Sequence, residues 1–236
     1  MNVLIIDCNI LPNYFGAKDL SREILKHKEL TLYVRRGPSQ DWSEPFLKNM
    51  DRIIISGSLT PATANEPWIS SLLDLIRWCG RHATPLLGVC FGHQMIARAY
   101  GGDLKVQRAK TPEIGWTRIN KTHSNSILKS LPSSFYSFSS HLDEVIQVPN
   151  DFQVIASSDH CQIQAFRHLK KPLFGIQFHP EKSLNEGQKC FSDYDSKKWG
   201  SFFLNKKEGV KYYSEEVGKS IFNEFLYTQW HSVLKR

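Results

Sequence analysis

The chain has 236 residues, of which 41% are hydrophobic and 22% charged, a composition typical of ordinary globular proteins. Its net charge is +7, but the basic residues are scattered and no zinc-finger or RNA-binding signature accompanies them, so we expect a basic solvated surface and no nucleic-acid partner. The longest apolar run falls far short of the roughly 18 residues that span a bilayer, so we expect no membrane-spanning helix.

The amino-terminal residues and the cysteines indicate a cytoplasmic protein without a metal or disulfide framework. The first ten residues, MNVLIIDCNI, have no basic lead and reach Asp7 quickly, unlike a signal peptide. The cysteines are odd in number, widely spaced and without a CxxC pair; they are Cys8, Cys79, Cys90, Cys161 and Cys190. We therefore expect buried thiols, one of which could serve as a nucleophile, and no cofactor.

The first hundred residues alternate buried strands with amphipathic helices. The apolar runs predict strands at 2–6, 30–34, 52–56 and 85–89. Helical spacing predicts helices at 17–27, from about Asn65 to Gly80, and from 91 to the glycine pair 101–102. This alternation is typical of an α/β fold with a doubly wound, mostly parallel sheet and helices on both faces.

The second half of the chain predicts an antiparallel extension of the same sheet. Short apolar segments separated by turns lie at 115–119, 134–139, 144–148, 152–157, 161–168 and 173–178. Residues 186–213 then interleave seven aromatic residues with lysines, and Ser214 could cap a last helix. We expect one domain over 1–184, with 185–236 packed on it as an aromatic and basic insertion and a carboxyl-terminal helix. The aromatic segment is either surface packing or a flap or docking surface near the functional site.

The stretch PLLGVCFGHQ, residues 85–94, places Cys90 between two glycines where a predicted strand meets a helix. Gly88 and Gly92 let the backbone turn sharply there, which is the thiol form of a nucleophile elbow. The helix dipole and free amides at such a turn favour the thiolate. The N–H of Phe91 could then face an oxyanion formed on a substrate carbonyl. The pattern predicts that Cys90 is a nucleophile; the alternative is a small buried residue between glycines.

A nucleophilic thiol requires a base, and His179 is the best candidate among the nine histidines. His179 follows the predicted strand LFGIQF, so it also emerges at a strand end, where open α/β sheets bind ligands. Glu181, two residues on, could accept a hydrogen bond from the far ring nitrogen and fix the tautomer. His93 lies too close to Cys90 in sequence, and we expect it to shape the pocket.

The motifs GVCFGHQ and GIQFHPE together resemble the class I glutamine amidotransferases, the triad-type glutaminases that include the amidotransferase part of GMP synthase. The resemblance covers about residues 1–184 and implies a flavodoxin-like sheet with Cys90 as nucleophile, His179 as base and Glu181 as orienting acid. It implies attack on a γ-glutamyl carbonyl and a thioester intermediate, without a cofactor.

The resemblance also implies the substrate-binding residues. Gln94 would help to hold the substrate glutamine, and Ser140 and His141 would form a strand-end loop whose backbone receives its α-amino and carboxylate end. Gly57 and Ser58 stand where the family usually has two glycines, so Ser58 would supply the second oxyanion-hole N–H. A positive φ, if that position required one, would strain a serine.

Three functions remain open from the sequence. The first is a glutamine-hydrolysing subunit that passes ammonia to a separate synthetase, because the chain has no ATP-binding P-loop. The second is a free-standing γ-glutamyl peptidase acting on γ-glutamyl or glutathione conjugates, towards which several shorter matches point, among them Pro112–Gly115, His141–Val145 and Ile155–Asp159. The third is a binding or regulatory protein on an inactive scaffold, against which the intact Cys90, His179 and Glu181 argue.

Overall fold

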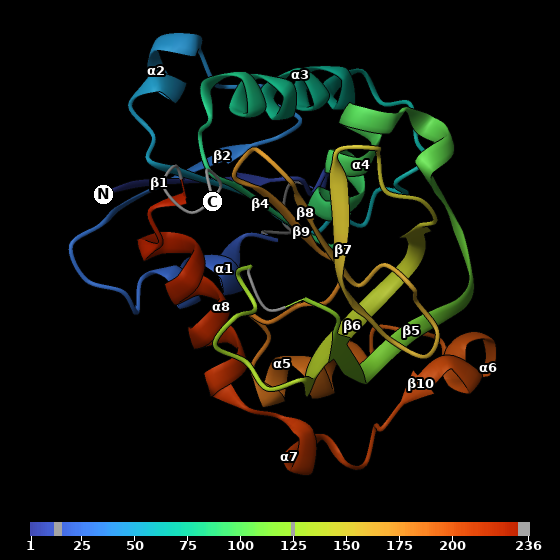
Figure 1. The fold of residues 1–236 in the computed structure, drawn as a ribbon. Helices are drawn as coiled ribbons and strands as arrows, with labels where there is room; N and C mark the ends of the chain where they lie inside the picture. Colours follow the sequence, from blue (N-terminus) through green and yellow to red (C-terminus); the bar gives the residue numbers. More distant parts are fainter. Residues whose placement is uncertain (12–15, 124–125, 231–236) are drawn as a thin grey trace.

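The structure is a computed structural model that describes residues 1–11, 16–123 and 126–230 (Figure 1). Its strands form a single ten-stranded sheet in the described part of the chain. Five parallel strands run in the order β2-β1-β3-β4-β9. They are β1 (Asn2–Asp7), β2 (Thr31–Arg36), β3 (Arg52–Ile55), β4 (Leu86–Val89) and β9 (Leu173–Ile176). This order is that of flavodoxin-like sheets, so the predicted doubly wound α/β fold is confirmed.

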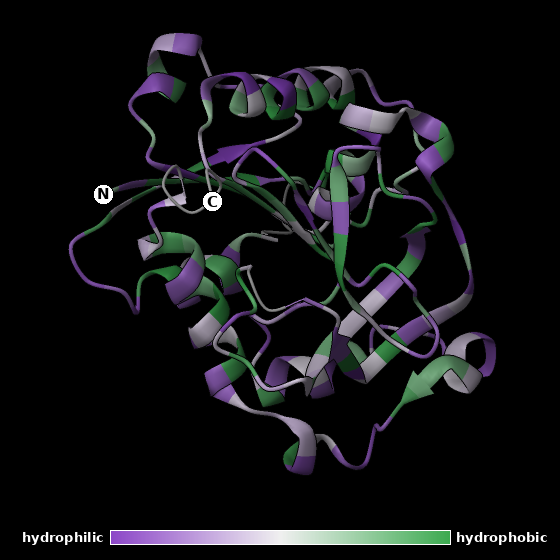
Figure 2. Cartoon of the chain, in the orientation of Figure 1, coloured by the Kyte–Doolittle hydropathy of each residue, from purple (hydrophilic) through white to green (hydrophobic). Residues whose placement is uncertain are grey.

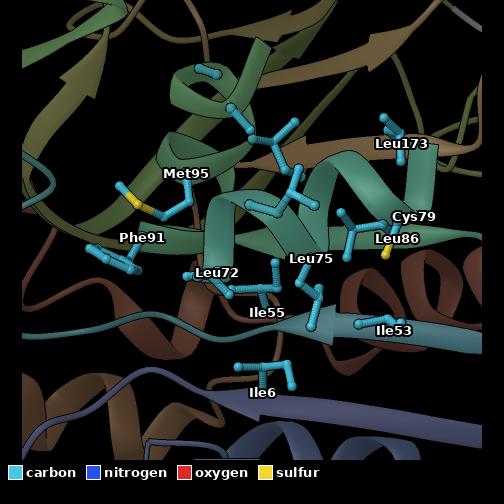
Figure 3. Packing of buried hydrophobic residues seen from close by; sticks show 14 of the residues in the cluster. Ile6, Ile53, Ile55, Leu72, Leu75, Cys79, Leu86, Phe91, Met95 and Leu173 are labelled. Atoms are coloured by element: carbon cyan, nitrogen blue, oxygen red, sulfur yellow. The ribbon is translucent and has the colours of Figure 1, made fainter. Parts of the chain in front are cut away.

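Helices cover both faces of the parallel strands. On one face lie α2 (Glu44–Lys48), α3 (Pro67–His82) and α4 (Phe91–Gly101); on the other lie α1 (Lys18–Ile24) and α8 (Glu215–Tyr227). The strand residues alternate between the two cores, because successive side chains of a strand point to opposite faces. Ile53 and Ile55 pack with α3 and α4, whereas Ile54 packs with α1 and α8. Figure 3 shows the first core, in which Leu72 and Met95 lie over the strands.

The remaining strands form the antiparallel extension that the sequence predicts. They are β5 (Val106–Lys121), β6 (Ser134–Val145), β7 (Phe152–Ser157) and β8 (Ala165–His168), with β8 pairing with β9. The prediction of a separate strand at 144–148 is wrong. Glu144 and Val145 are the last residues of β6, whose ladder with β5 ends at the pair Val106 and Val145, and residues 146–148 lie outside any strand. The strand predicted at 161–168 is also shorter, since Cys161 turns back to bond the N–H of Ser158.

Residues 184–213 form a small layer against β5 and β6, with α5 (Leu184–Cys190), α6 (Ser196–Trp199), β10 (Phe203–Leu204) and α7 (Gly209–Tyr212). β10 pairs with β5 at Gly115, whose φ is +138° and where a Cβ would lie 2.0 Å from the Leu204 carbonyl oxygen. Phe191 is buried against Trp116 and Phe138 in a separate aromatic cluster. Figure 2 shows both apolar and polar residues along this layer.

Phe191 provides a test of whether this layer packs as part of the same folded unit. Its side chain is 2% exposed and meets the Phe138 ring edge-on at 5.7 Å. Phe191→Ala should therefore lower the free energy of unfolding by about 3–5 kcal/mol, as for other buried aromatic residues. Val210→Ala is the matched control in the same layer, because Val210 is 79% exposed. Urea denaturation measures both; equal stabilities would show that the layer is not part of the cooperative core.

None of the helices in the described ranges is long and apolar enough to cross a membrane.

Candidate active site

The carboxyl ends of β3, β4 and β9 meet at one edge of the sheet and bring the predicted residues together. Ile55 pairs with Gly88, and Val89 pairs with Ile176, so Gly57 and Cys90 leave the sheet on neighbouring strands. The N–H of Cys90 donates to the Ile176 carbonyl at 2.8 Å. A Cβ added to Gly57 would lie 3.6 Å from the Cys90 Cβ and 3.0 Å from His179 Cε1. Strand register and these close approaches together place Gly57, Cys90 and His179 side by side.

Cys90 occupies a strained turn at the start of α4. Its φ of 51° and ψ of −103° are unusual for a residue with a side chain. The turn brings the chain so close to itself that a Cβ on Gly88 would lie 2.4 Å from the Gly92 carbonyl, and one on Gly92 would lie 2.5 Å from the Ile55 carbonyl. Only glycine fits at these two positions. The strained residue is thus held from both sides, as expected where strain serves function.

His179 and Glu181 form a buried pair beside Cys90. The His179 Nδ1 and the Glu181 Oε1 are 2.7 Å apart, and the His179 N–H donates to the Phe138 carbonyl of β6 at 2.7 Å. Burial by itself would lower the pKa of His179, but the charge of Glu181 and the hydrogen-bonded Cys90 raise it to about 10. Burial would raise the pKa of Glu181, whereas the charge of His179 brings it below its usual value. Both effects favour a charged imidazolium–carboxylate pair.

The two predicted oxyanion donors come from different elements, Phe91 from the start of α4 and Ser58 from the loop after β3. Phe91 is the first residue of α4, so its N–H is one of those that a helix leaves without an intrahelical acceptor. Ser58 belongs to the loop after β3, where its hydroxyl donates to the Cys8 carbonyl at 2.7 Å and accepts from the N–H of Thr60. Ser58 is not among the described residues with positive φ. The serine at this position therefore carries no such strain.

Of the predicted substrate-binding residues, Gln94 lines the cavity as expected, whereas Ser140 and His141 lie in a different element from the one predicted. Gln94 lines the cavity and donates to the Asp143 carbonyl at 2.8 Å and to Gln177 Oε1 at 3.0 Å. Ser140 and His141 do not form the expected strand-end loop, since both lie inside β6. They lie next to a register shift, where residues 109–112 of β5 bulge between the paired positions. The shift leaves Leu142 of β6 without a paired residue on β5, and the strand continues to Val145.

The His141 ring is held from behind by a buried polar cluster. Its Nε2 lies 3.0 Å from Glu113 Oε2, and its Nδ1 lies 3.2 Å from the Asp143 carbonyl. Glu113 is fully buried and also accepts hydrogen bonds from Ser158 and Gln164. With both ring nitrogens engaged by protein partners, what His141 can offer a ligand is its backbone.

A cavity of about 260 Å³ opens beside Cys90 and His179. Sequence reasoning missed several of its walls: Asn9, Arg108, Asp143, Lys182, Cys190 and Tyr194. Of these, Asn9 could have been found from its place just beyond β1, at the same sheet edge. Tyr194 hydrogen-bonds to Ser140 at 2.9 Å, so the layer formed by residues 184–213, the aromatic layer, also contributes to the cavity wall. His93 is fully buried against Phe166, with its pKa lowered to about 3 by burial, and is not among the lining residues.

Fold and site together define an α/β protein with a cysteine, a histidine and a glutamate gathered at the carboxyl edge of its sheet. The chain belongs to the class I glutamine amidotransferases: the family described as "Glutamine amidotransferase class-I" matches residues 10–194. The matched span includes α5 and ends at Tyr194.

Curated relatives agree with this family, and a solved structure shares the fold. The chain is 45% identical to a subunit of the glutamine-hydrolysing GMP synthase of Methanocaldococcus jannaschii over 43% of this chain and 53% of the relative. It is 38% identical to the protein of the same name from Thermoplasma acidophilum over 70% of this chain and 80% of the relative. A glutamine amidotransferase of Thermotoga maritima shares the fold, with a TM-score of 0.75, 20% identity and coverage of 100% and 99% of the two chains. The chain thus spans about half the length of the first of these relatives.

Proposed function

We propose that the protein hydrolyses the γ-amide of glutamine through a thioester on Cys90. The observation that carries the proposal is the strained Cys90 beside a His179 that is paired with a buried Glu181. A thiol, a base and an orienting carboxylate in this order are what nucleophilic acyl transfer requires. The same intact set argues against a binding protein on an inactive scaffold.

In the proposed reaction, the Cys90 sulfur attacks the γ-carbonyl carbon, and the carbonyl electron pair moves onto its oxygen. The N–H groups of Phe91 and Ser58 stabilise this oxyanion. His179 gives a proton to the leaving nitrogen as the carbon–nitrogen bond breaks, which releases ammonia and leaves a thioester. Water then attacks the thioester while His179 takes its proton, and the carbon–sulfur bond breaks to release glutamate and restore the thiolate.

The substrate would lie in the cavity between β3 and β6. Gly57 leaves room next to the His179 ring, and Gln94 contributes its amide to the wall. The backbone at Ser140 and His141, which line the cavity, would receive the amino-acid end of the substrate. All four residues line the cavity, and their roles in substrate binding are those that the family resemblance implies.

The names of the relatives support glutamine as the substrate and a partner as the ammonia acceptor. They denote one subunit of a glutamine-hydrolysing GMP synthase. In this proposal, a separate synthetase subunit uses the ammonia released here. A γ-glutamyl peptidase would use the same residues and release an amine in place of ammonia, so the nucleophile and its base do not separate the two functions.

The test is a release assay that compares glutamine with γ-glutamyl peptides on the purified protein. We expect glutamate and ammonia from glutamine, with a higher kcat/KM than for any γ-glutamyl peptide. A higher kcat/KM for the peptides would show that the protein is a γ-glutamyl peptidase and not a glutaminase. Absence of glutamate release from all of these compounds, with or without a synthetase subunit, would contradict the proposed function.

A further inference from the structure

Arg108 is a cation of the cavity wall that the proposed chemistry does not use. It lies on β5, directly opposite Asp143 of β6, at the last pair before the register shift. Its Nη1 is 3.3 Å from Asp143 Oδ1, and its side chain is 54% exposed. The side chain therefore lines the cavity and is also exposed to solvent.

The guanidinium of Arg108 has donors to spare. Within the part of the chain that the structure describes, its hydrogen bonding is confined to Asp143. An arginine has five N–H donors in a planar fork that matches a carboxylate. Several of these donors are consequently left for water or for a ligand in the cavity.

The other cations of the cavity are committed to protein partners. Lys182 is bound to the buried Asp19 carboxylate at 2.6 Å, and its side chain is only 18% exposed. His179 is paired with Glu181. A ligand carboxylate entering this cavity thus meets its most available positive charge at Arg108.

The aromatic layer holds Arg108 in place. The guanidinium carbon lies 5.7 Å from the centre of the Trp199 ring, within the range of a cation–π contact. Tyr194, five residues before Trp199, hydrogen-bonds to Ser140 on the facing strand. A side chain fixed by Asp143 on one side and by a ring on the other loses less entropy when it binds a ligand.

From this arrangement we infer that Arg108 is a specificity residue that binds a carboxylate of the substrate. The inference builds on the proposed function, because every γ-glutamyl compound carries an α-carboxylate and many carry a second one on the leaving group. The chemistry is the same for the two sources, a bidentate contact between guanidinium and carboxylate. Trp199 acts as a positioning residue that orients the guanidinium.

The kinetic test compares four substrates with wild-type protein and with Arg108→Ala. They are glutamine, the α-amide of glutamine, γ-glutamylglycine and γ-glutamyl ethylamide. Loss of a charge-assisted contact should raise KM about tenfold or more, with kcat changed by less than about threefold. If the α-carboxylate is the ligand, the penalty appears for all substrates except the α-amide. If the leaving-group carboxylate is the ligand, it appears only for γ-glutamylglycine.

Three further variants control this experiment. Arg118→Ala removes an exposed arginine of the same strand that contacts Ser134 and lies outside the cavity lining, so KM should not change. Arg108→Lys keeps the charge but loses the fork, and should recover only part of the affinity. Trp199→Ala should raise KM less than Arg108→Ala does. A KM that stays constant for all four substrates in Arg108→Ala would overturn the inference.

A binding measurement separates this inference from the proposed function. Calorimetry with γ-glutamylglycine, which carries both carboxylates, on Cys90→Ser protein should give a Kd that weakens about tenfold or more when Arg108→Ala is added. The Kd of glutamate, which has no leaving group, should weaken as well if Arg108 binds the α-carboxylate. If the wild-type protein hydrolyses none of the substrates but the Kd still weakens without Arg108, the proposed function is wrong and the carboxylate site stands. An equal Kd with and without Arg108, or no binding of either compound, would overturn the carboxylate site.

Discussion

Cys90→Ala should abolish glutamate release while leaving the protein folded. Removal of the nucleophile of a triad lowers kcat by about 10⁶, which is below detection for most hydrolases. The fold should persist, because alanine fits the same buried turn and leaves Gly88 and Gly92 in place. The measurement is a release assay at saturating glutamine together with a thermal melt. A variant that keeps more than about a thousandth of wild-type turnover would show that another group attacks the substrate.

Cys190 supplies the matched control for this variant, because it lines the same cavity. Cys190→Ala should keep turnover within about a factor of ten. A glutamine-like electrophile should label Cys90, as located by mass spectrometry of the digested protein. Label on Cys190 in wild-type protein would contradict the assignment of Cys90 as the nucleophile.

The remaining thiols should stay unlabelled for a physical reason. Cys8, Cys79 and Cys161 are fully buried. Burial raises the pKa of each of these thiols well above the usual value, which suppresses the reactive thiolate. Their removal should affect packing and leave the chemistry intact.

The parts of the site that the sequence predicted are those that short segments determine. Gly88 is required by its close approach to Gly92, four residues on, and the Glu181 carboxylate reaches His179 across one proline. The parallel strands were recognisable from their continuous apolar runs, and their ends necessarily share one edge of the sheet. Local pattern and a general rule of topology were enough for these residues.

The walls of the cavity could not be predicted in this way, because distant segments form them. Arg108 and Asp143 meet only because β5 and β6 pair in one register. Tyr194 reaches Ser140 across 54 residues, and no periodicity indicates that contact. The sequence predicts a loop at Ser140 and His141, but both lie inside β6, because a register shift in the partner strand lets β6 continue and leaves no signal in the sequence of β6.

His179→Ala and Glu181→Gln should separate the base from the residue that orients it. Loss of the base in a triad lowers kcat by about 10⁶ and loss of the carboxylate by about 10⁴. Glu181 accepts from the His179 ring at 2.7 Å and has no contact with the substrate in the proposed reaction, so the smaller effect is expected of it. Single-turnover release of ammonia measures both. Equal losses would mean that Glu181 takes part in proton transfer itself.

The pH profile gives the same pair a readout that a structural role would not change. Burial lowers the pKa of His179, but Glu181, the largest opposing influence, and Cys90 raise it to about 10. The thiolate–imidazolium pair is lost when pH rises through that value, so the basic limb of kcat/KM should lie near pH 10 in wild-type protein. Glu181→Gln removes the main raising influence, and the limb should move to lower pH. Glu215→Gln is the matched control, because it removes an exposed carboxylate that pairs with Lys26 on the surface, and it should leave the limb in place. A limb that stays near pH 10 without Glu181 would show that this carboxylate does not set the proton affinity of the base.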